Sequence, residues 1–239
     1  MTTLSVNTLR ENVARVQDRI DRAASVSGRD PTTVKLISVS KTFPVSCVET
    51  AWQIGLTDFG ENRVQEAQHK MQQLSELPIK WHLIGHLQSN KTRIAATQFD
   101  WIHSVDNDKI LRRIDEAAID AGTAPRVLLQ VDLAGETTKH GAKPDDVRRI
   151  CEVGQTCKSV KIRGLMLMPP WHESPEMLRP YFRRLSKLRD TLVRDGVNNT
   201  VLSELSMGMS HDLDIAIEEG ATMIRVGTAI FGLRTGAGT

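Results

Sequence analysis

The sequence predicts a single parallel (β/α)8 barrel of the TIM type, and three observations favour this fold. Short apolar segments typical of strands alternate eight times with segments of helical periodicity. The strand segments are almost continuously apolar, as expected of parallel strands buried on both faces. The connections are short and the composition does not change along the chain, so we expect one domain over residues 1–239. A doubly wound open sheet is the alternative, although it normally needs fewer units.

An extra helix is expected before the barrel, over residues 6–26. Its apolar residues recur at helical spacing, at Leu9, Val13, Val16, Ile20 and Ala24. Glycine and proline in the segment 28–31 end this helix. Residues 1–30 are therefore an N-terminal helical segment that precedes the first strand.

The repeating units follow in order along the rest of the chain. The strands are expected over residues 34–40, 56–60, 81–85, 101–105, 126–133, 162–168, 201–206 and 221–226. The helices between them are expected near residues 45–52, 64–74, 91–97, 110–121, 147–154, 178–192 and 213–217, where apolar residues are three or four apart. Residues 233–239 are expected to form a frayed tail.

Composition excludes several classes of protein. The chain is 40% hydrophobic and 25% charged, with a formal net charge of +2, which is ordinary for a soluble protein. Basic residues are scattered, so we expect no nucleic-acid partner. No apolar stretch is long enough to span a membrane, and the N-terminus lacks the basic and apolar regions of a signal peptide.

Cysteine usage indicates a cytoplasmic protein without a metal site. Cys47, Cys151 and Cys157 are odd in number and not closely paired, which argues against a disulfide framework and a zinc site. We therefore expect all three to be reduced.

The most informative residue is Lys41. It follows the apolar segment 34–40, which is rich in β-branched residues, and Pro44 can begin the next helix. In a barrel of this type the active site lies at the carboxyl ends of the strands. Burial there disfavours the ammonium form, lowers the pKa of the amine and frees it to attack a carbonyl. Lys41 is therefore a candidate Schiff-base lysine.

The loops after the seventh and eighth strands predict a phosphate site. The segment 206–210 joins a strand to a helix, Gly208 allows close backbone approach, and Ser210 is a candidate N-cap. Gly227 and Thr228 add a second glycine and a hydroxyl. Such barrels commonly hold phosphate in these two loops. A lysine and a phosphate site in one mouth indicate a ligand with a carbonyl and a phosphate, such as pyridoxal phosphate or a ketose phosphate.

Several motifs resemble the pyridoxal phosphate homeostasis proteins, the family also described as alanine racemase N-terminal-domain-like. The matching stretches span nearly the whole chain: Ser38-Val39-Ser40-Lys41-Thr42, Phe59-Gly60-Glu61-Asn62-Arg63-Val64-Gln65-Glu66, residues 81–91, residues 102–106, Gly164-Leu165-Met166, Leu205-Ser206-Met207-Gly208-Met209-Ser210-His211-Asp212 and Arg225-Val226-Gly227-Thr228-Ala229-Ile230-Phe231-Gly232. The segment 205–212 is the most specific of these.

The resemblance implies a fold-type III barrel that binds pyridoxal phosphate, with Lys41 carrying the cofactor as an internal aldimine. It implies cofactor-binding roles for Lys41, Asn62, Ser206, Met207, Gly208, Ser210, Arg225, Gly227 and Thr228. Asn62 would lie near the ring, Arg225 beside its nitrogen, and the segment 206–210 with Gly227 and Thr228 around the phosphate. Asp132 receives no role, His82 is interpreted as structural, and a ligand contact of His86 is left open.

The hypothesis that we favour is intracellular pyridoxal phosphate homeostasis without efficient turnover, so no catalytic residue is assigned. Arg225 stays protonated and can only donate to the ring nitrogen, which leaves the ring a weaker electron sink. Fold-type III racemases add a β domain after the barrel, whereas this sequence is expected to lack one. The alternatives are an amino acid racemase and a Schiff-base aldolase. Apoenzymes that use pyridoxal phosphate are candidate partners, and monomer or weak dimer is left open.

Overall fold

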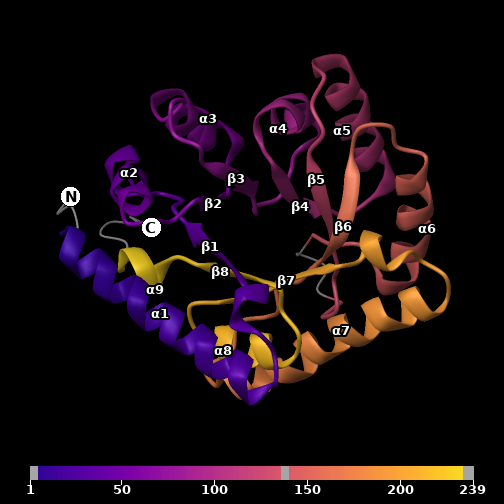
Figure 1. The fold of residues 1–239 in the computed structure, drawn as a ribbon. Coiled ribbons are helices and arrows are strands. Elements are labelled where there is room, and N and C mark those ends of the chain that lie inside the picture. Colours follow the sequence, from indigo (N-terminus) through magenta and orange to yellow (C-terminus); the bar gives the residue numbers. More distant parts are fainter. Residues whose placement is uncertain (1–4, 136–139, 234–239) are drawn as a thin grey trace.

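The computed structural model describes residues 5–135 and 140–233, and within them eight parallel strands close into a barrel (Figure 1). The strands are β1 (Lys35–Val39), β2 (Asp58–Glu61), β3 (Lys80–Leu83), β4 (Trp101–Val105), β5 (Arg126–Gln130), β6 (Lys161–Met166), β7 (Glu204–Met209) and β8 (Met223–Val226). Each strand pairs with the next in the chain, and β8 pairs with β1. The barrel prediction is therefore confirmed, and the open sheet is wrong.

The helices surround the barrel and alternate with its strands (Figure 1). They are α1 (Val6–Val26), α2 (Val45–Gln53), α3 (Val64–Gln73), α4 (Thr92–Gln98), α5 (Asp108–Ala121), α6 (Pro144–Gln155), α7 (Arg179–Arg194), α8 (Leu213–Glu218) and α9 (Thr228–Phe231). Short 3-10 turns lie at Pro31–Thr33, Ser89–Lys91, Pro175–Leu178 and Asn199–Val201. In the described part of the chain, no helix is long and apolar enough to cross a membrane.

Most of the predicted elements are confirmed, and α1 and β4 have the predicted bounds. The end of the seventh strand is wrong, because β7 covers residues 204–209 rather than 201–206. The chain before β7 instead makes a 3-10 turn at Asn199–Val201. Helix α9, which directly follows β8, was not predicted. Most of the predicted tail, residues 234–239, lies outside the described residues.

Two apolar layers fill the barrel and its surroundings. The strands of the closed sheet pack their outer faces against the helices in one large cluster. A smaller cluster fills the interior: Ile37, Trp101, Leu128, Met166 and Met223. Cys47 and Cys151 are buried in the packing, and all three cysteines are unpaired as predicted. A filled interior makes the barrel a solid support for the loops at its carboxyl end.

Helix α1 lies along the outside of the barrel, against α8 and α9 (Figure 1). Its apolar stripe is buried, and Ser5 caps its first turn by accepting a hydrogen bond from the backbone N–H of Thr8. The side-chain amide of Asn12 donates to the carbonyl of Ile230 at 2.7 Å. Arg19 donates to the carbonyl of Ser210 at 2.8 Å. The extra helix therefore fixes the chain after both β7 and β8.

Gly208 lies inside β7 and contacts a helix, not a loop. Its φ is +92°, and a Cβ there would lie 2.6 Å from the Cβ of Ala216 on α8. Both the backbone conformation and the close packing of α8 on β7 therefore require glycine. The predicted close approach exists, but the approaching group belongs to α8.

We expect Gly208→Ala to destabilise the protein by about 1–3 kcal/mol, because it adds overpacking to an unfavourable positive φ. Urea unfolding at pH 7.5 measures the change. Gly196→Ala is the matched control, since Gly196 has a φ of +100° but open space around its Cβ position. Equal losses in the two variants would show that backbone strain alone, and not the contact with α8, determines the requirement.

Candidate functional site

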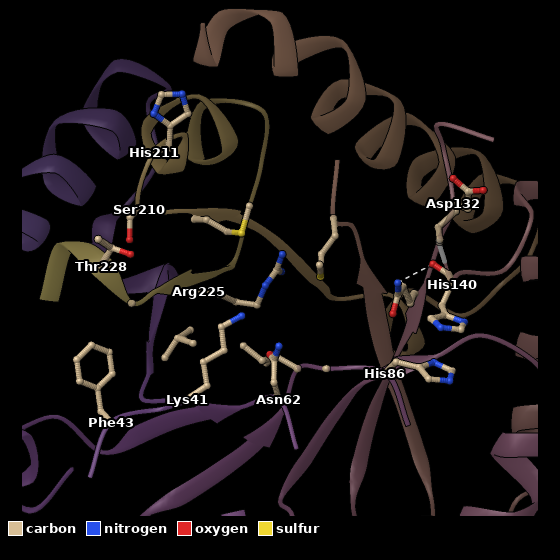
Figure 2. Close-up of a pocket in the computed structure, with 18 residues that line it drawn as sticks. Lys41, Phe43, Asn62, His86, Asp132, His140, Ser210, His211, Arg225 and Thr228 are labelled. Carbon is tan, nitrogen blue, oxygen red and sulfur yellow. Dashed lines mark hydrogen bonds between the residues drawn. The ribbon is translucent and has the colours of Figure 1, made fainter. Parts of the chain in front are cut away.

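A cavity of about 440 Å³ opens at the carboxyl ends of the strands (Figure 2). Six of the nine predicted site residues line it: Lys41, Asn62, Ser210, Arg225, Gly227 and Thr228. They come from the ends of β1, β2, β7 and β8. Figure 2 shows Lys41, Asn62 and Arg225 projecting into the same space. The structure thus brings together residues that are far apart in the sequence.

The other three predicted residues lie in β7 and are not among the described residues that line the cavity. The expectation that they form a loop after the strand is wrong. Met207 is fully buried in the apolar layer outside the barrel, and Gly208 faces α8. Ser206 is also fully buried, and its hydroxyl accepts a hydrogen bond from Arg225 at 2.7 Å. Ser206 therefore contacts Arg225, which lines the cavity, from the side away from the cavity.

Lys41 begins the turn after β1, and the turn contains a strained backbone position. The next residue, Thr42, has a φ of +69°, which β-branched residues rarely adopt. Its backbone N–H donates to the carboxylate of Glu66 on α3. Strained positions of this kind persist where the surroundings hold them, and they cluster at functional sites. The position of Lys41 is thus coupled to α3.

A buried ion pair beneath this turn explains how α3 holds it. The ammonium of Lys70, which is 3% exposed, donates to Glu61 at 2.6 Å, to Glu66 at 3.0 Å and to the carbonyl of Ser40 at 2.8 Å. The hydroxyl of Ser40 also donates to Glu61, at 2.7 Å. Burial raises the pKa of Glu61, and Lys70 opposes that shift. The sequence analysis missed Lys70, because its spacing from Glu66 is equally typical of a pair on a solvated helix face.

Arg225 forms the opposite wall, and its guanidinium is almost fully buried. It donates to the hydroxyl of Ser206 and, at 2.9 Å, to the carbonyl of Leu167. Burial lowers the pKa of Arg225 to about 10, and the charge of Asp212 opposes that shift. Arg225 therefore remains a cation at neutral pH and presents donors to the cavity.

The region predicted to hold phosphate combines hydroxyls with a close backbone approach. Ser210 and Thr228 line the cavity side by side (Figure 2). The hydroxyl of Ser210 accepts a hydrogen bond from the backbone N–H of Ala229 at 3.2 Å, so it supports α9. The prediction of Ser210 as the N-cap of α8 is wrong, because Asp212 takes that position. A Cβ on Gly227 would lie 3.2 Å from the carbonyl of Val39, so glycine lets β8 approach β1 here.

The rim carries polar residues that the sequence analysis did not assign. His86 lines the cavity and stacks on His140, with ring centroids 3.4 Å apart and planes within 8°. Ligand atoms of both rings and of Asp106 lie within 4.8 Å of one another, but a metal ion cannot lie in two stacked ring planes at once. Burial and the neighbouring His140 lower the pKa of His86. Gln130, the polar last residue of an apolar strand, donates to the carbonyl of His140 at 2.7 Å.

The fold and the cavity define a class: parallel (β/α)8 barrels with a lysine after the first strand and a buried arginine on the last. A family model described as "Alanine racemase, N-terminal domain" matches residues 4–235, and the chain belongs to this family. A "Pyridoxal phosphate homeostasis protein" of Pseudomonas aeruginosa is 46% identical over 230 residues, which cover 96% of this chain and 97% of that protein.

Solved structures are similar to this chain in fold. The structure of PipY from Synechococcus elongatus with PLP bound superposes with a TM-score of 0.80 at 41% identity, covering 90% of this chain and 100% of that one. An alanine racemase of Clostridium difficile has a TM-score of 0.76 at 15% identity. This chain spans 58% of that enzyme, and the likeness shows the fold alone.

Replacing Lys70 tests the support beneath Lys41. We expect Lys70→Met to cost about 3–5 kcal/mol of stability, because it leaves the fully buried Glu61 carboxyl without its counter-charge. Urea unfolding measures the loss. The matched control is Arg149→Met, which removes an exposed pair with Asp108 and should cost at most about 1 kcal/mol. Similar losses in both variants would contradict a supporting role for the buried pair.

The histidines inside the barrel give stability a pH dependence. Burial lowers the pKa of His82 and, more strongly, that of His103. The unfolded chain therefore binds protons more tightly than the folded protein. Stability is fully present above about pH 6.5 and is lost as pH falls from there toward the folded pKa values, by up to about 1.4 kcal/mol per pH unit for each histidine.

We expect urea unfolding between pH 7.5 and 5.5 to show this slope, and His103→Gln to reduce it. His172→Gln, which removes an exposed histidine, should leave it unchanged. Asp58 does not interfere, because its pKa is lowered and it titrates in stronger acid. A slope in His103→Gln as steep as that of the wild type would contradict the assignment of a neutral, buried His103.

Proposed function

We propose that this protein binds pyridoxal phosphate in the cavity at the barrel mouth and serves the homeostasis of that cofactor. The observation that carries the proposal is the placement of Lys41 and the buried cation Arg225 in one cavity, with hydroxyls of Ser210 and Thr228 beside them. The names of the Pseudomonas relative and of the cofactor-bound PipY structure support it.

The cavity residues fit the functional groups of the cofactor. When bound, pyridoxal phosphate supplies an aldehyde that condenses reversibly with a lysine amine, with the loss of one water. Lys41 offers that amine. The hydroxyls of Ser210 and Thr228 offer hydrogen bonds to phosphate oxygens, and Gly227 lets β8 approach β1 beside them. Asn62 would lie beside the ring, and Arg225 would donate to its nitrogen.

The chemistry of Arg225 favours binding of the cofactor over its use in catalysis. A buried arginine with a pKa of about 10 remains protonated, so it can donate a hydrogen bond to the ring nitrogen but cannot accept one from it. An unprotonated ring withdraws electrons weakly, and carbanion chemistry is disfavoured. We therefore place storage and delivery of the cofactor first and amino acid racemisation second. Apoenzymes that need the cofactor are the proposed recipients.

Labelling and substitution of Lys41 test this function. We expect the purified protein with added pyridoxal phosphate to show a visible absorbance band, and borohydride reduction followed by peptide mapping to label Lys41. Lys41→Ala should lose the band, because Lys41 is the one lysine among the described residues that line the cavity. Lys41→Arg keeps the positive charge but offers no free amine, so it should also lose the band, whereas Lys187→Ala changes an exposed lysine on α7 and should keep it. A band of full intensity in Lys41→Ala would overturn the assignment.

Turnover assays on the cofactor-loaded protein distinguish binding from catalysis. Under the proposed function, turnover of D- or L-alanine is negligible even when the cavity is loaded. Turnover at about 1 per second or faster that depends on Lys41 would instead favour the racemase. Trapping of a ketose phosphate on Lys41 by borohydride would favour an aldolase.

A further inference from the structure

A chain of hydrogen bonds crosses the inside of the barrel and ends on Arg225. It begins at the carboxylate of Asp58 in β2, which lies 2.9 Å from Nε2 of His82. Nδ1 of His82 lies 3.0 Å from Nε2 of His103, and Nδ1 of His103 lies 2.9 Å from the hydroxyl of Ser206. Ser206 in turn accepts from Arg225. These hydrogen bonds link five strands, β2, β3 and β4 on one side of the barrel and β7 and β8 on the other, through the barrel interior.

The chemistry of the two ends fixes the position of every proton between them. Burial alone would raise the pKa of Asp58, but the hydrogen bond from His82 and the nearby Lys35 lower it, so Asp58 is ionised and only accepts. His82 must then carry its proton on Nε2. Because burial keeps the ring neutral, its Nδ1 is an acceptor.

The same reasoning continues to the other end of the chain. His103 must donate from Nε2 to His82, and its own pKa is held well below 6.5 by burial and by nearby positive charge, including that of Arg225. Its Nδ1 therefore accepts from the hydroxyl of Ser206. That hydroxyl oxygen is left to accept from Arg225. All the hydrogen bonds thus point in one direction, from the cation toward Asp58.

We propose that Asp58, His82, His103 and Ser206 are positioning residues that orient the guanidinium of Arg225 toward the ligand ring. This inference rests on the proposed function, since it takes pyridoxal phosphate as the occupant of the cavity. None of the four is among the described residues that line the cavity, so they act through Arg225. The alternative is a polar plug whose members satisfy one another and have no effect on the ligand.

Geometry favours positioning. Nη1 of Arg225 is committed to Ser206 and Nη2 to the carbonyl of Leu167, at 2.7 and 2.9 Å. A planar guanidinium held at two nitrogens cannot rotate about its long side chain. The polar partner on the Ser206 side is itself held by two histidines and a carboxylate. A change at Asp58, at the far end of the chain, should therefore alter the contact that Arg225 makes in the cavity.

The first experiment reads the proton positions in the cofactor-free protein. Long-range proton–nitrogen NMR of the histidine-labelled wild type should show His82 and His103 as neutral rings with the proton on Nε2 at pH 7.5. A proton on Nδ1 of either ring, or a charged ring, would overturn the one-directional chain. This experiment needs no variant and does not depend on ligand binding.

The second experiment measures the ligand. We expect Ser206→Ala to weaken binding of pyridoxal phosphate about 10-fold or more, as for the loss of a hydrogen bond to a charged group, and to shift the visible band of the bound cofactor. Asp58→Asn should change both in the same direction by a smaller factor. Ser104→Ala and Asp115→Asn are the matched controls and should leave both unchanged. Ser104 is a buried serine of β4, and Asp115 is a buried carboxylate of α5 that accepts the backbone N–H groups of residues 158–160.

The outcomes separate this inference from the proposed function. If the wild type does not bind pyridoxal phosphate, both fall. If it binds and Asp58→Asn behaves like Asp115→Asn in dissociation constant and spectrum, the polar plug is correct and positioning is overturned. Near-ultraviolet circular dichroism checks that each variant is folded. If Ser206→Ala does not fold, Asp58→Asn and the NMR of the wild type still decide.

Discussion

The rest of the structure depends on the pairing of β1 with β8. Ile37 pairs with Arg225 and Ser38 with Val226, so the two strands end at the same level. Lys41 and Gly227 therefore emerge side by side, although they belong to opposite ends of the barrel sequence. Without closure, the amine and the loop at 227–228 would lie at opposite edges of an open sheet. The cavity is thus a consequence of register, and strand residues such as Val39, Gln130 and Arg225 form part of its wall.

Each wall is also tied to a buried charge. The turn of Lys41 is held by Lys70 and its two glutamates, and Arg225 is held by the polar chain inside the barrel. Burying ions is costly unless every donor and acceptor finds a partner, and breaking one partner away costs more than the pair contributes. The two networks therefore hold the turn of Lys41 and the guanidinium of Arg225 in place.

The order of the elements could be predicted from the sequence because periodicity and strand composition record it. Lys41, Asn62 and the pair at 227–228 could be placed at the mouth because strand ends share one edge of a barrel. The end of β7 could not, because the segment 206–210 contains a glycine and hydroxyls that are equally typical of a loop. What keeps Gly208 in the strand is the close packing of α8, a contact between residues that no local pattern records. The burial of Lys70 could not be predicted for the same reason, because it depends on contacts with Ser40 and Glu61 that no local pattern records.

The direction of the hydrogen bonds inside the barrel has a further physical meaning. A neutral imidazole has one donor and one acceptor, so a row of such rings can be satisfied in only two ways, and the charges at its ends choose between them. Here the anion Asp58 and the cation Arg225 favour the same direction of the hydrogen bonds. Each group between them donates one hydrogen bond and accepts one. A substitution at one end cannot be compensated by rotating one ring, because every ring between would have to change its tautomer. The proposed effect of Asp58 on the distant cavity follows from this all-or-none order and does not require any movement of the backbone.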